Sequence, residues 1–264
     1  AYPPDSPWWF RDERGEKVRF WQGCWNMDVG HPDYLDHIAR RIAAVVEATD
    51  GVCGIFLDNL RGDRRSRAAW TNLLGRVRER CGDVPILVNA GWSSDDLDWV
   101  APWINGLMYE NSIAHTRDGD AEAFYARVRR QWSLLREPRV SVNEVFGARD
   151  DAEAMQRELA RTLVYTDAFF LYSDSTQGHR HSWWEHWNAP LGAAVDGPVS
   201  PFSGRLAVRH FAGGRVAWLP ADAPASVTIE LDTPHRPSDD HMAVTRVRLR
   251  PGQGVVLIRQ SREP

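Results

Sequence analysis

The chain has 264 residues, enough to bury a large core as one α/β domain with a small appendage. A hydrophobic content of 43% and a charged content of 26% are typical of folded globular proteins and argue against disorder. The net charge of -4 gives no basic footprint that would attract nucleic acid or an anionic membrane, so we expect neither as a partner.

Thirteen tryptophans are the compositional outlier. Indole rings fill cores, but they also stack on the apolar faces of sugar rings, so their number raises the expectation of a carbohydrate ligand. The three cysteines lack the spacing of metal ligands, and their odd number does not suit a framework of disulfides. We therefore expect Cys24, Cys53 and Cys81 to be free, mostly buried thiols. No stretch approaches the roughly 20 apolar residues of a spanning helix, and no signal-peptide pattern opens the chain. A mature secreted protein would look the same, so localisation stays open.

The first 31 residues are irregular in pattern, with two aromatic runs on either side of a turn at Gly15. This arrangement predicts a hairpin or an extended loop. A helix then opens at His31-Pro32-Asp33, because the apolar residues that follow fall on one face at helical spacing.

Five short apolar runs follow, and each stops on a carboxylate or an amide. The first of them predicts a fully buried, parallel strand that contains Cys53. One such run is usually just a strand that leaves the core. Five in series, separated by helix-like stretches, favour a functional site, because parallel β/α folds build their sites at the carboxyl ends of strands. The runs and the residues that end them are 52–57 with Asp58 and Asn59, 85–88 with Asn89, 106–109 with Glu110, 139–142 with Asn143 and Glu144, and 168–172 with Ser173 and Asp174.

This alternation predicts an α/β fold with a parallel sheet and right-handed crossovers. An open doubly wound sheet and a closed TIM-type (β/α) barrel both produce it. No Gly-x-Gly-x-x-Gly follows a strand, so we favour the barrel as the catalytic domain, residues 1–200. A whole barrel takes roughly 250 residues, whereas the β/α pattern ends near residue 174. We therefore expect an incomplete barrel with fewer than eight parallel strands and an open side near residues 1–31.

Near Pro201 the apolar period changes from 3.6 to 2, which predicts a small C-terminal antiparallel β-sandwich domain, residues 201–264. Before it, three histidines occur within eight positions: His179, His181 and His186. Tryptophans interleave with them, and no placed carboxylate accompanies them. A loop that caps the barrel mouth is therefore the better interpretation, and we expect no metal and no cofactor.

The stretch from Asp28 to Asp58, with its His-Pro-Asp opening, a helix and then Gly-Ile-Phe-Leu-Asp, resembles the fourth-strand segment of β/α-barrel glycoside hydrolases. The nearest families are those close to the endo-α-1,4-polygalactosaminidases and α-galactosidases. Residues 209–216 are similar to the first hairpin of the β-sandwich that closes many such enzymes. The strands expected ahead of the helix at Pro32 are not in the sequence, apart from what residues 1–31 can supply. We therefore expect a fragment or a shortened barrel.

The resemblance implies a hydrolase of oligo- or polysaccharides, with Asp58 as the nucleophile and Glu110 as the acid/base. Glycoside hydrolysis needs two carboxyl groups that flank one bond. Helix capping or a salt bridge to Arg61 or Arg64 is the structural alternative for Asp58, and pairing with an arginine is the alternative for Glu110. Glu144 is a third acid that could replace Glu110 as the proton donor.

Substrate hydroxyls need partners that both donate and accept, which Asn59 and Asn89 offer; Asp174 is expected to orient a hydroxyl. The candidate stacking platforms, each with a structural alternative, are Trp25, Trp92, Tyr109 and Trp184. A Ser-His-Asp hydrolase lacks support, because no Gly-x-Ser-x-Gly elbow occurs. A carbohydrate-binding or degenerate barrel without competent chemistry is the non-enzyme alternative. The sugar, the linkage, the stereochemical outcome and the oligomeric state stay open.

Overall fold

The structure is a computed structural model of the whole chain. The residues that it describes are 2–60, 64–89, 91, 97–110, 121–176, 181, 183–199, 205–238, 240 and 242–260. They divide into two compact units: unit 1 comprises Ala1–Leu107 and Leu134–Arg139, and unit 2 comprises Met108–Ser133 and Val140–Pro264. Within the described residues, no helix has the length and apolar character needed to cross a membrane.

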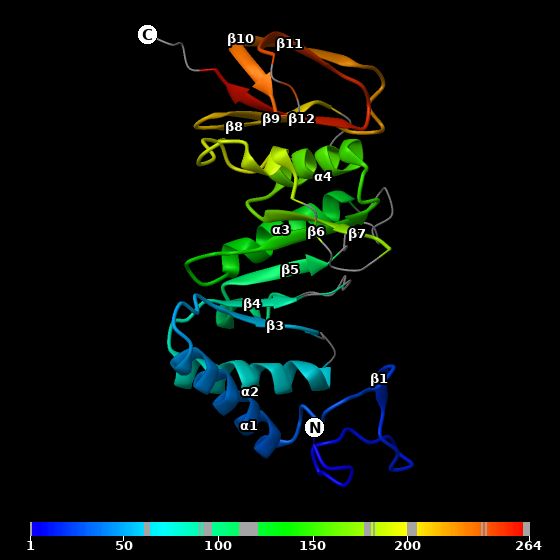
Figure 1. Cartoon of the computed structure of the whole chain (residues 1–264), viewed down its shortest axis with the longest axis vertical. Helices are drawn as coiled ribbons and strands as arrows, with labels where there is room; N and C mark the ends of the chain where they lie inside the picture. The colour runs from blue at the N-terminus through cyan, green and yellow to red at the C-terminus, as the bar shows by residue number, and fades with distance from the viewer. Residues whose placement is uncertain are drawn as a thin grey trace. The chain divides into compact units, whose positions relative to one another are not determined.

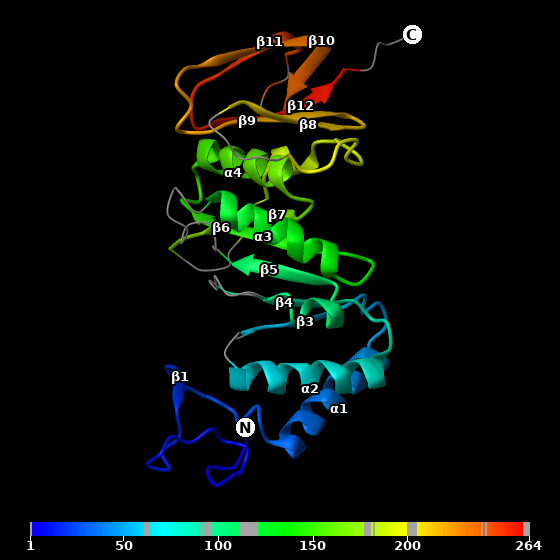
Figure 2. The same ribbon diagram turned by 180° about the vertical axis from the view of Figure 1, so that it is seen from behind.

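Unit 1 contains a short N-terminal hairpin and the first helices and strands of the β/α pattern (Figure 1). Its elements are β1 (Arg19–Trp21), β2 (Cys24–Trp25), α1 (Pro32–Ala48), β3 (Ile55–Leu57), α2 (Arg64–Cys81), β4 (Ile86–Asn89) and η1 (Ala101–Trp103). The two views in Figures 1 and 2 agree that α1 and α2 lie side by side, next to β3.

Helix α1 begins where the sequence predicts it. His31 caps it by accepting a hydrogen bond from the backbone of Asp33 (3.3 Å), and Pro32 occupies a first-turn position where its missing N–H costs nothing. Asp36 then ties α1 to α2, because Arg80 donates to its carboxylate at 2.7 Å. That hydrogen bond holds the pKa of Asp36 below its ordinary value.

Strand β3 is shorter and more exposed than its sequence predicts. It pairs in parallel with β4, but it stands at the edge of the parallel sheet. Phe56 is 52% exposed, and Cys53 lies before the strand and is also exposed. The prediction of a fully buried strand with a buried thiol is therefore wrong, because an edge strand has a neighbour on one side only. Cys24 is exposed too, and Cys81 is partly buried.

Unit 2 contains the rest of the β/α pattern and an antiparallel sheet. Its elements are β5 (Gly106–Glu110, which begins in unit 1), α3 (Ala121–Leu134), β6 (Val142–Gly147), α4 (Ala152–Tyr165), β7 (Phe169–Asp174), η4 (Glu185–Asn188), β8 (Ala207–Phe211), β9 (Gly214–Leu219), β10 (Val227–Pro237), β11 (Val244–Leu249) and β12 (Gln253–Arg259). The parallel strands follow the order β3-β4-β5-β6-β7, and the antiparallel strands follow the order β11-β10-β12-β9-β8.

The fold prediction is confirmed: a parallel β/α core precedes an antiparallel β domain. The described residues hold five parallel strands, and none of β8 to β12 joins their sheet. A domain boundary near residue 200 stays a prediction, because residues 200–204 lie outside the described part of the chain.

In unit 2, helix α4 packs directly on the antiparallel sheet, as Figures 1 and 2 both show. The approach is close, because a Cβ added to Gly254 would clash with the side chain of Ala160. Arg209 of β8 is only 2% exposed and donates to the carbonyl oxygens of Leu163 (2.8 Å) and Thr166, at the end of α4. Buried guanidinium groups require such partners, so Arg209 fixes the β domain to α4.

Candidate functional site

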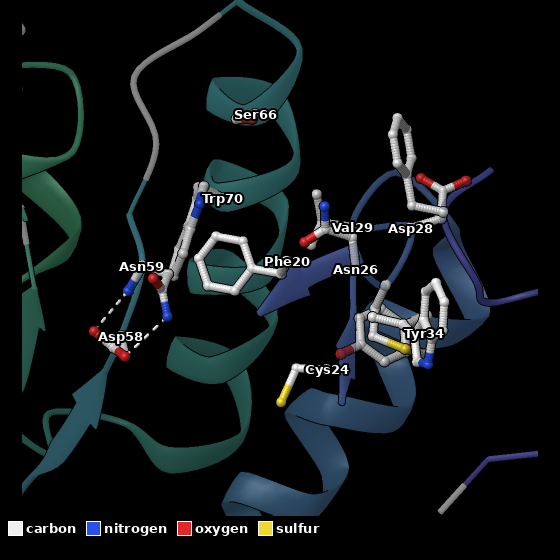
Figure 3. A pocket seen from close by; sticks show the side chains of 13 residues that line it. Phe20, Cys24, Asn26, Asp28, Val29, Tyr34, Asp58, Asn59, Ser66 and Trp70 are labelled. Atoms are coloured by element: carbon white, nitrogen blue, oxygen red, sulfur yellow. Dashed lines mark hydrogen bonds between the residues drawn. The ribbon is translucent and has the colours of Figure 1, made fainter. Parts of the chain in front are cut away.

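The end of β3 presents a carboxylate that three hydrogen bonds orient, and Figure 3 draws the two that come from Asn59. The side-chain amide of Asn89, from the end of β4, donates to Asp58 Oδ1 at 2.9 Å. Asn59 donates through its backbone N–H to Oδ1 (2.9 Å) and through its side-chain amide to Oδ2 (2.8 Å). Asp58 itself is exposed. The side chain is thus held in one direction and open to a ligand.

Asn59 has an unusual backbone conformation that makes this arrangement possible. Its φ of 64° lies in the left-handed region, and among the described residues it is the one non-glycine with positive φ. Asparagine tolerates this region better than most residues because its short side chain can hydrogen-bond locally, here to Asp58. Backbone outliers of this kind cluster at ligand sites.

Asp58 opens into a pocket of about 470 Å³, drawn in Figure 3. Five aromatic side chains line it: Phe10, Phe20, Trp25, Tyr34 and Trp70. Four more polar side chains join Asp58 there: Asn26, Asp28, Asn59 and Ser66. The pocket therefore combines apolar ring faces with hydrogen-bonding groups, the combination typical of small-molecule sites.

The N-terminal segment, residues 2–31, forms one wall of this pocket and does not fill it. Its backbone is held together by hydrogen bonds from Phe10 N to Asn26 O (3.0 Å), Asn26 N to Val18 O (2.9 Å) and Val18 N to Phe10 O (3.1 Å). The pairing brings Phe10 and Asn26 to the same pocket although they are far apart in sequence. The aromatic runs on both sides of Gly15 were the sequence signal for this wall.

Tyr34 is a weaker acid in this pocket than an ordinary tyrosine. Partial burial raises its pKa from 10 to about 12, and the neighbouring Tyr2 adds to the shift. The phenol therefore stays neutral over the ordinary pH range and acts as a donor and acceptor.

Unit 2 has a second cluster of polar groups at its strand ends. Glu110 and Glu144 are partners in the register of the parallel strands β5 and β6. Glu144 is fully buried, and the hydroxyl of Ser173 donates to it. His181 Nδ1 lies 2.9 Å from the same hydroxyl, and a β-bridge pairs the backbones of Ser173 and His181. Glu110 is only partly buried.

Other predicted residues lie in different surroundings. Tyr109 is 2% exposed and donates its hydroxyl to Gln131 of α3 at 2.8 Å, so it faces the helices. Asp174 Oδ1 accepts hydrogen bonds from the backbone (2.8 Å) and hydroxyl (2.6 Å) of Thr176, and so it closes a turn. Trp184 packs edge-on against Tyr172, at 6.0 Å between ring centroids.

The remaining candidates from the sequence are the platforms Trp92 and Trp25 and the structural alternatives for Asp58, which are a salt bridge to an arginine and the capping of a helix. Trp92 and Arg61 lie outside the described residues, as does the side chain of Arg64. Asn59, which follows Asp58, has a left-handed backbone and Leu60 is not helical, so Asp58 does not cap a helix. Trp25 lines the pocket of Asp58, with Lys17 Nζ 5.1 Å from its ring centroid.

No metal-binding cluster is visible in the described part of the chain. There, no group of three or more His, Cys, Asp or Glu side chains is arranged to hold a metal ion. The chemistry that these sites offer is that of carboxylates, amides, hydroxyls and aromatic rings.

Comparison with known proteins relates the fold to glycoside hydrolases. No protein-family model matches the chain, and no curated protein matches it in sequence. Solved structures do match. An α-amylase from Geobacillus thermoleovorans, complexed with acarbose, is 11% identical in sequence and matches with a TM-score of 0.53. The match covers 98% of this chain and 75% of the amylase chain.

Two other solved structures give the same result. The cyclic α-maltosyl-(1→6)-maltose hydrolase from Arthrobacter globiformis, complexed with cyclic α-maltosyl-(1→6)-maltose, is 18% identical with a TM-score of 0.54, covering 96% of this chain and 69% of its own. A GH27 β-L-arabinopyranosidase from Geobacillus stearothermophilus is 10% identical with a TM-score of 0.55, covering 90% of this chain and 64% of its own. At these identities the likeness is one of fold: a glycoside-hydrolase-like β/α core with a C-terminal β domain.

Proposed function

We propose that the chain is a glycoside hydrolase that cleaves an oligo- or polysaccharide, with Asp58 and Glu110 as its two catalytic carboxyl groups. The observation that carries the proposal is Asp58 itself, which is exposed, oriented by amide donors and located in an aromatic pocket. The fold shared with glycoside hydrolases supports it. The similar structures solved in complex with acarbose and with cyclic α-maltosyl-(1→6)-maltose support a sugar as the ligand.

In this proposal the two carboxyl groups have different roles. Glu110 gives its proton to the glycosidic oxygen as the bond to the anomeric carbon breaks. In one route the Asp58 carboxylate attacks that carbon, and water that loses its proton to Glu110 then hydrolyses the glycosyl-enzyme. In the other route Asp58 accepts a proton from the water that attacks the carbon directly. A separation of about 5 to 5.5 Å between the carboxyl groups belongs to the first route, and about 6.5 to 9.5 Å to the second.

The surroundings of the two glutamates favour Glu110 over Glu144 as the proton donor. Glu144 is fully buried and bonded to Ser173, whereas Glu110 is partly exposed at the end of its strand. A general acid must come within hydrogen-bond reach of the leaving oxygen. A partly exposed side chain meets this requirement without a change in packing.

The remaining assignments concern the substrate. We assign Asn59 and Asn89 to the orientation of Asp58 and to contact with sugar hydroxyls, and Trp25 to stacking in the pocket. Trp92, Trp184 and Asp174 are kept as substrate-binding candidates. Tyr109 is reassigned to the packing of β5 on α3, because its hydroxyl is bonded to Gln131.

The test is a screen of the purified chain against chromogenic glycosides and polysaccharides, followed by Asp58→Asn, Glu110→Gln and Glu144→Gln on the best substrate. We expect the first two variants to lose most turnover. Full activity in Asp58→Asn contradicts the mechanism. Loss in Glu144→Gln with a silent Glu110→Gln moves the proton donor to Glu144. Sugar binding without turnover of any substrate identifies a carbohydrate-binding barrel instead.

A further inference from the structure

Two neighbouring cavities in unit 2 have no part in the proposed chemistry. Their volumes are about 950 Å³ and about 570 Å³, and neither is lined by Asp58, Glu110 or Glu144. His186 and Ala189, in and next to η4, line both. The first cavity reaches Ala152 of α4 and the second reaches Leu163, so together they follow about 16 Å of this helix. The two cavities share these lining residues and lie along the same helix, and together we call them the α4 groove.

One end of the α4 groove is aromatic. Trp183 is 73% exposed and Phe169 is 63% exposed, and both line the smaller cavity. Trp183 meets Trp187 edge-on at 5.5 Å between ring centroids, and Trp187 meets Phe170 edge-on at 6.3 Å. These contacts hold the Trp183 ring while most of its surface faces solvent. An exposed, supported indole of this kind is a stacking surface for a sugar ring.

The other end of the α4 groove is polar and carries both signs of charge. The side chains that line the larger cavity with hydrogen-bonding groups include Glu153, Gln156, Glu185, Arg236, Ser238 and Gln253. They include carboxylates, amides and a guanidinium, which together accept from and donate to hydroxyl groups. Because the charges are mixed, this end favours an uncharged polar ligand over an anion or a cation.

Two buried polar atoms of the α4 groove lack partners. Ser238 Oγ, at the polar end, and Trp187 Nε1, at the aromatic end, are each buried without a hydrogen-bond partner among the described residues. Buried polar atoms in folded proteins are nearly always paired. Both atoms are enclosed by the protein, so a hydroxyl group in the groove reaches them only if the surrounding side chains shift.

We propose that the α4 groove is a second carbohydrate-binding site that holds an uncharged oligosaccharide chain along α4. One sugar ring stacks on Trp183, and hydroxyl groups further along the chain bond to the polar end near Gln253 and Ser238. A purely apolar ligand would strip water from the polar end without replacing its hydrogen bonds, which is costly. The site needs no catalysis, so the inference goes beyond the proposed hydrolysis and stands independently of it.

The experiment is isothermal titration of the full chain with maltoheptaose, cellohexaose and xylohexaose, in an Asp58→Asn background that limits turnover. We expect at least one probe to bind, and Trp183→Ala to weaken that binding at least tenfold. Gln253→Ala should weaken it severalfold. The matched control is Val195→Ala, which alters another exposed apolar residue (69% exposed) that lines neither cavity and should leave binding unchanged.

Trp183 is exposed, so its loss should leave the fold intact, which the thermal unfolding midpoint checks. Absence of binding by all three probes overturns the inference, as does equal binding by Trp183→Ala and Val195→Ala. The hydrolase proposal is tested separately, because Trp183→Ala with Asp58 intact should cleave a small chromogenic glycoside at the unaltered rate. Normal turnover together with unaltered oligosaccharide binding refutes the α4 groove alone.

Discussion

The strand ends of the two units carry acids in opposite surroundings. In unit 1, Asp58 is exposed, oriented by two asparagines and open to an aromatic pocket. In unit 2, Glu144 is fully buried and bonded to Ser173. Strand β3 stands at the edge of the parallel sheet, whereas β6 has a strand on each side. The same kind of residue at the same end of a strand is thus available to a ligand in one unit and committed to the protein interior in the other.

The first prediction tests whether Glu144 is structural. Glu144→Ala should lower the free energy of unfolding by about 1–3 kcal/mol, because it removes the buried hydrogen bond that Ser173 donates to Glu144. Asp58→Ala should change the same quantity by less than about 0.5 kcal/mol, as expected for an exposed residue. Urea denaturation of both variants measures the difference. Equal losses would remove the contrast between the two acids.

The second prediction concerns the orientation of Asp58. Asn89→Ala should lower kcat about tenfold and change KM less, because a misdirected carboxylate loses its reacting geometry while the pocket stays in place. Asn26→Ala, which removes another amide from the same pocket, is the control. If Asn26→Ala lowers kcat as much as Asn89→Ala, then Asn89 has no particular role in holding Asp58.

The third prediction separates backbone conformation from side-chain chemistry at Asn59. Asn59→Ala should destabilise the fold by about 1 kcal/mol, because alanine pays the cost of the left-handed conformation. Asn59→Gly should recover that stability, since glycine adopts positive φ freely, but it still lacks the amide that donates to Asp58. Chemical denaturation of both variants distinguishes them. Equal stability of the two would show that the backbone relaxes at this position.

The smallest expected effect concerns Tyr34 and alkaline pH. Its pKa is raised from 10 to about 12 in the folded state, so the stability linked to it is fully present below pH 10 and is lost as the pH rises towards 12. Tyr34→Phe should therefore lose stability less steeply than the unaltered chain between pH 10 and pH 12. Urea midpoints measured at pH 9 and at pH 11 test this. Parallel losses in the two proteins would contradict the assignment.

Much of the fold follows from local sequence pattern. Apolar runs that stop on Asp58, Asn89 and Glu110 predicted parallel strands and their ends, since buried strands are encoded by contiguous apolar residues. The exposure of Phe56 was not predictable in this way, because an apolar run does not reveal whether its strand lies at a sheet edge. The alternation of side chains along a strand does predict one feature of the site. Tyr109 and Glu110 are adjacent in β5, so their side chains face opposite sides of the sheet.

The pocket was harder to predict than the acid at its base. Phe10 and Phe20 reach it through the backbone pairing of the N-terminal segment, and Trp70 reaches it from α2. The segment carries no helical or alternating period that would place its side chains. Its walls therefore depend on non-local contacts that the sequence alone does not specify, whereas Asp58 is placed by the strand that it ends.

The most direct test of the central claim compares two aspartates of one pocket. Asp58 and Asp28 both line it, but Asp28 accepts a hydrogen bond from the backbone of Gly30 (2.9 Å) within its own turn, and we give it no catalytic role. On the best substrate from the glycoside screen, Asp58→Asn should lower kcat at least about 10³-fold. Asp28→Asn should lower kcat less than about tenfold, since the same isosteric change then leaves both catalytic carboxyl groups in place. Retention of more than a tenth of the activity by Asp58→Asn, or an equal loss in both variants, would contradict the account.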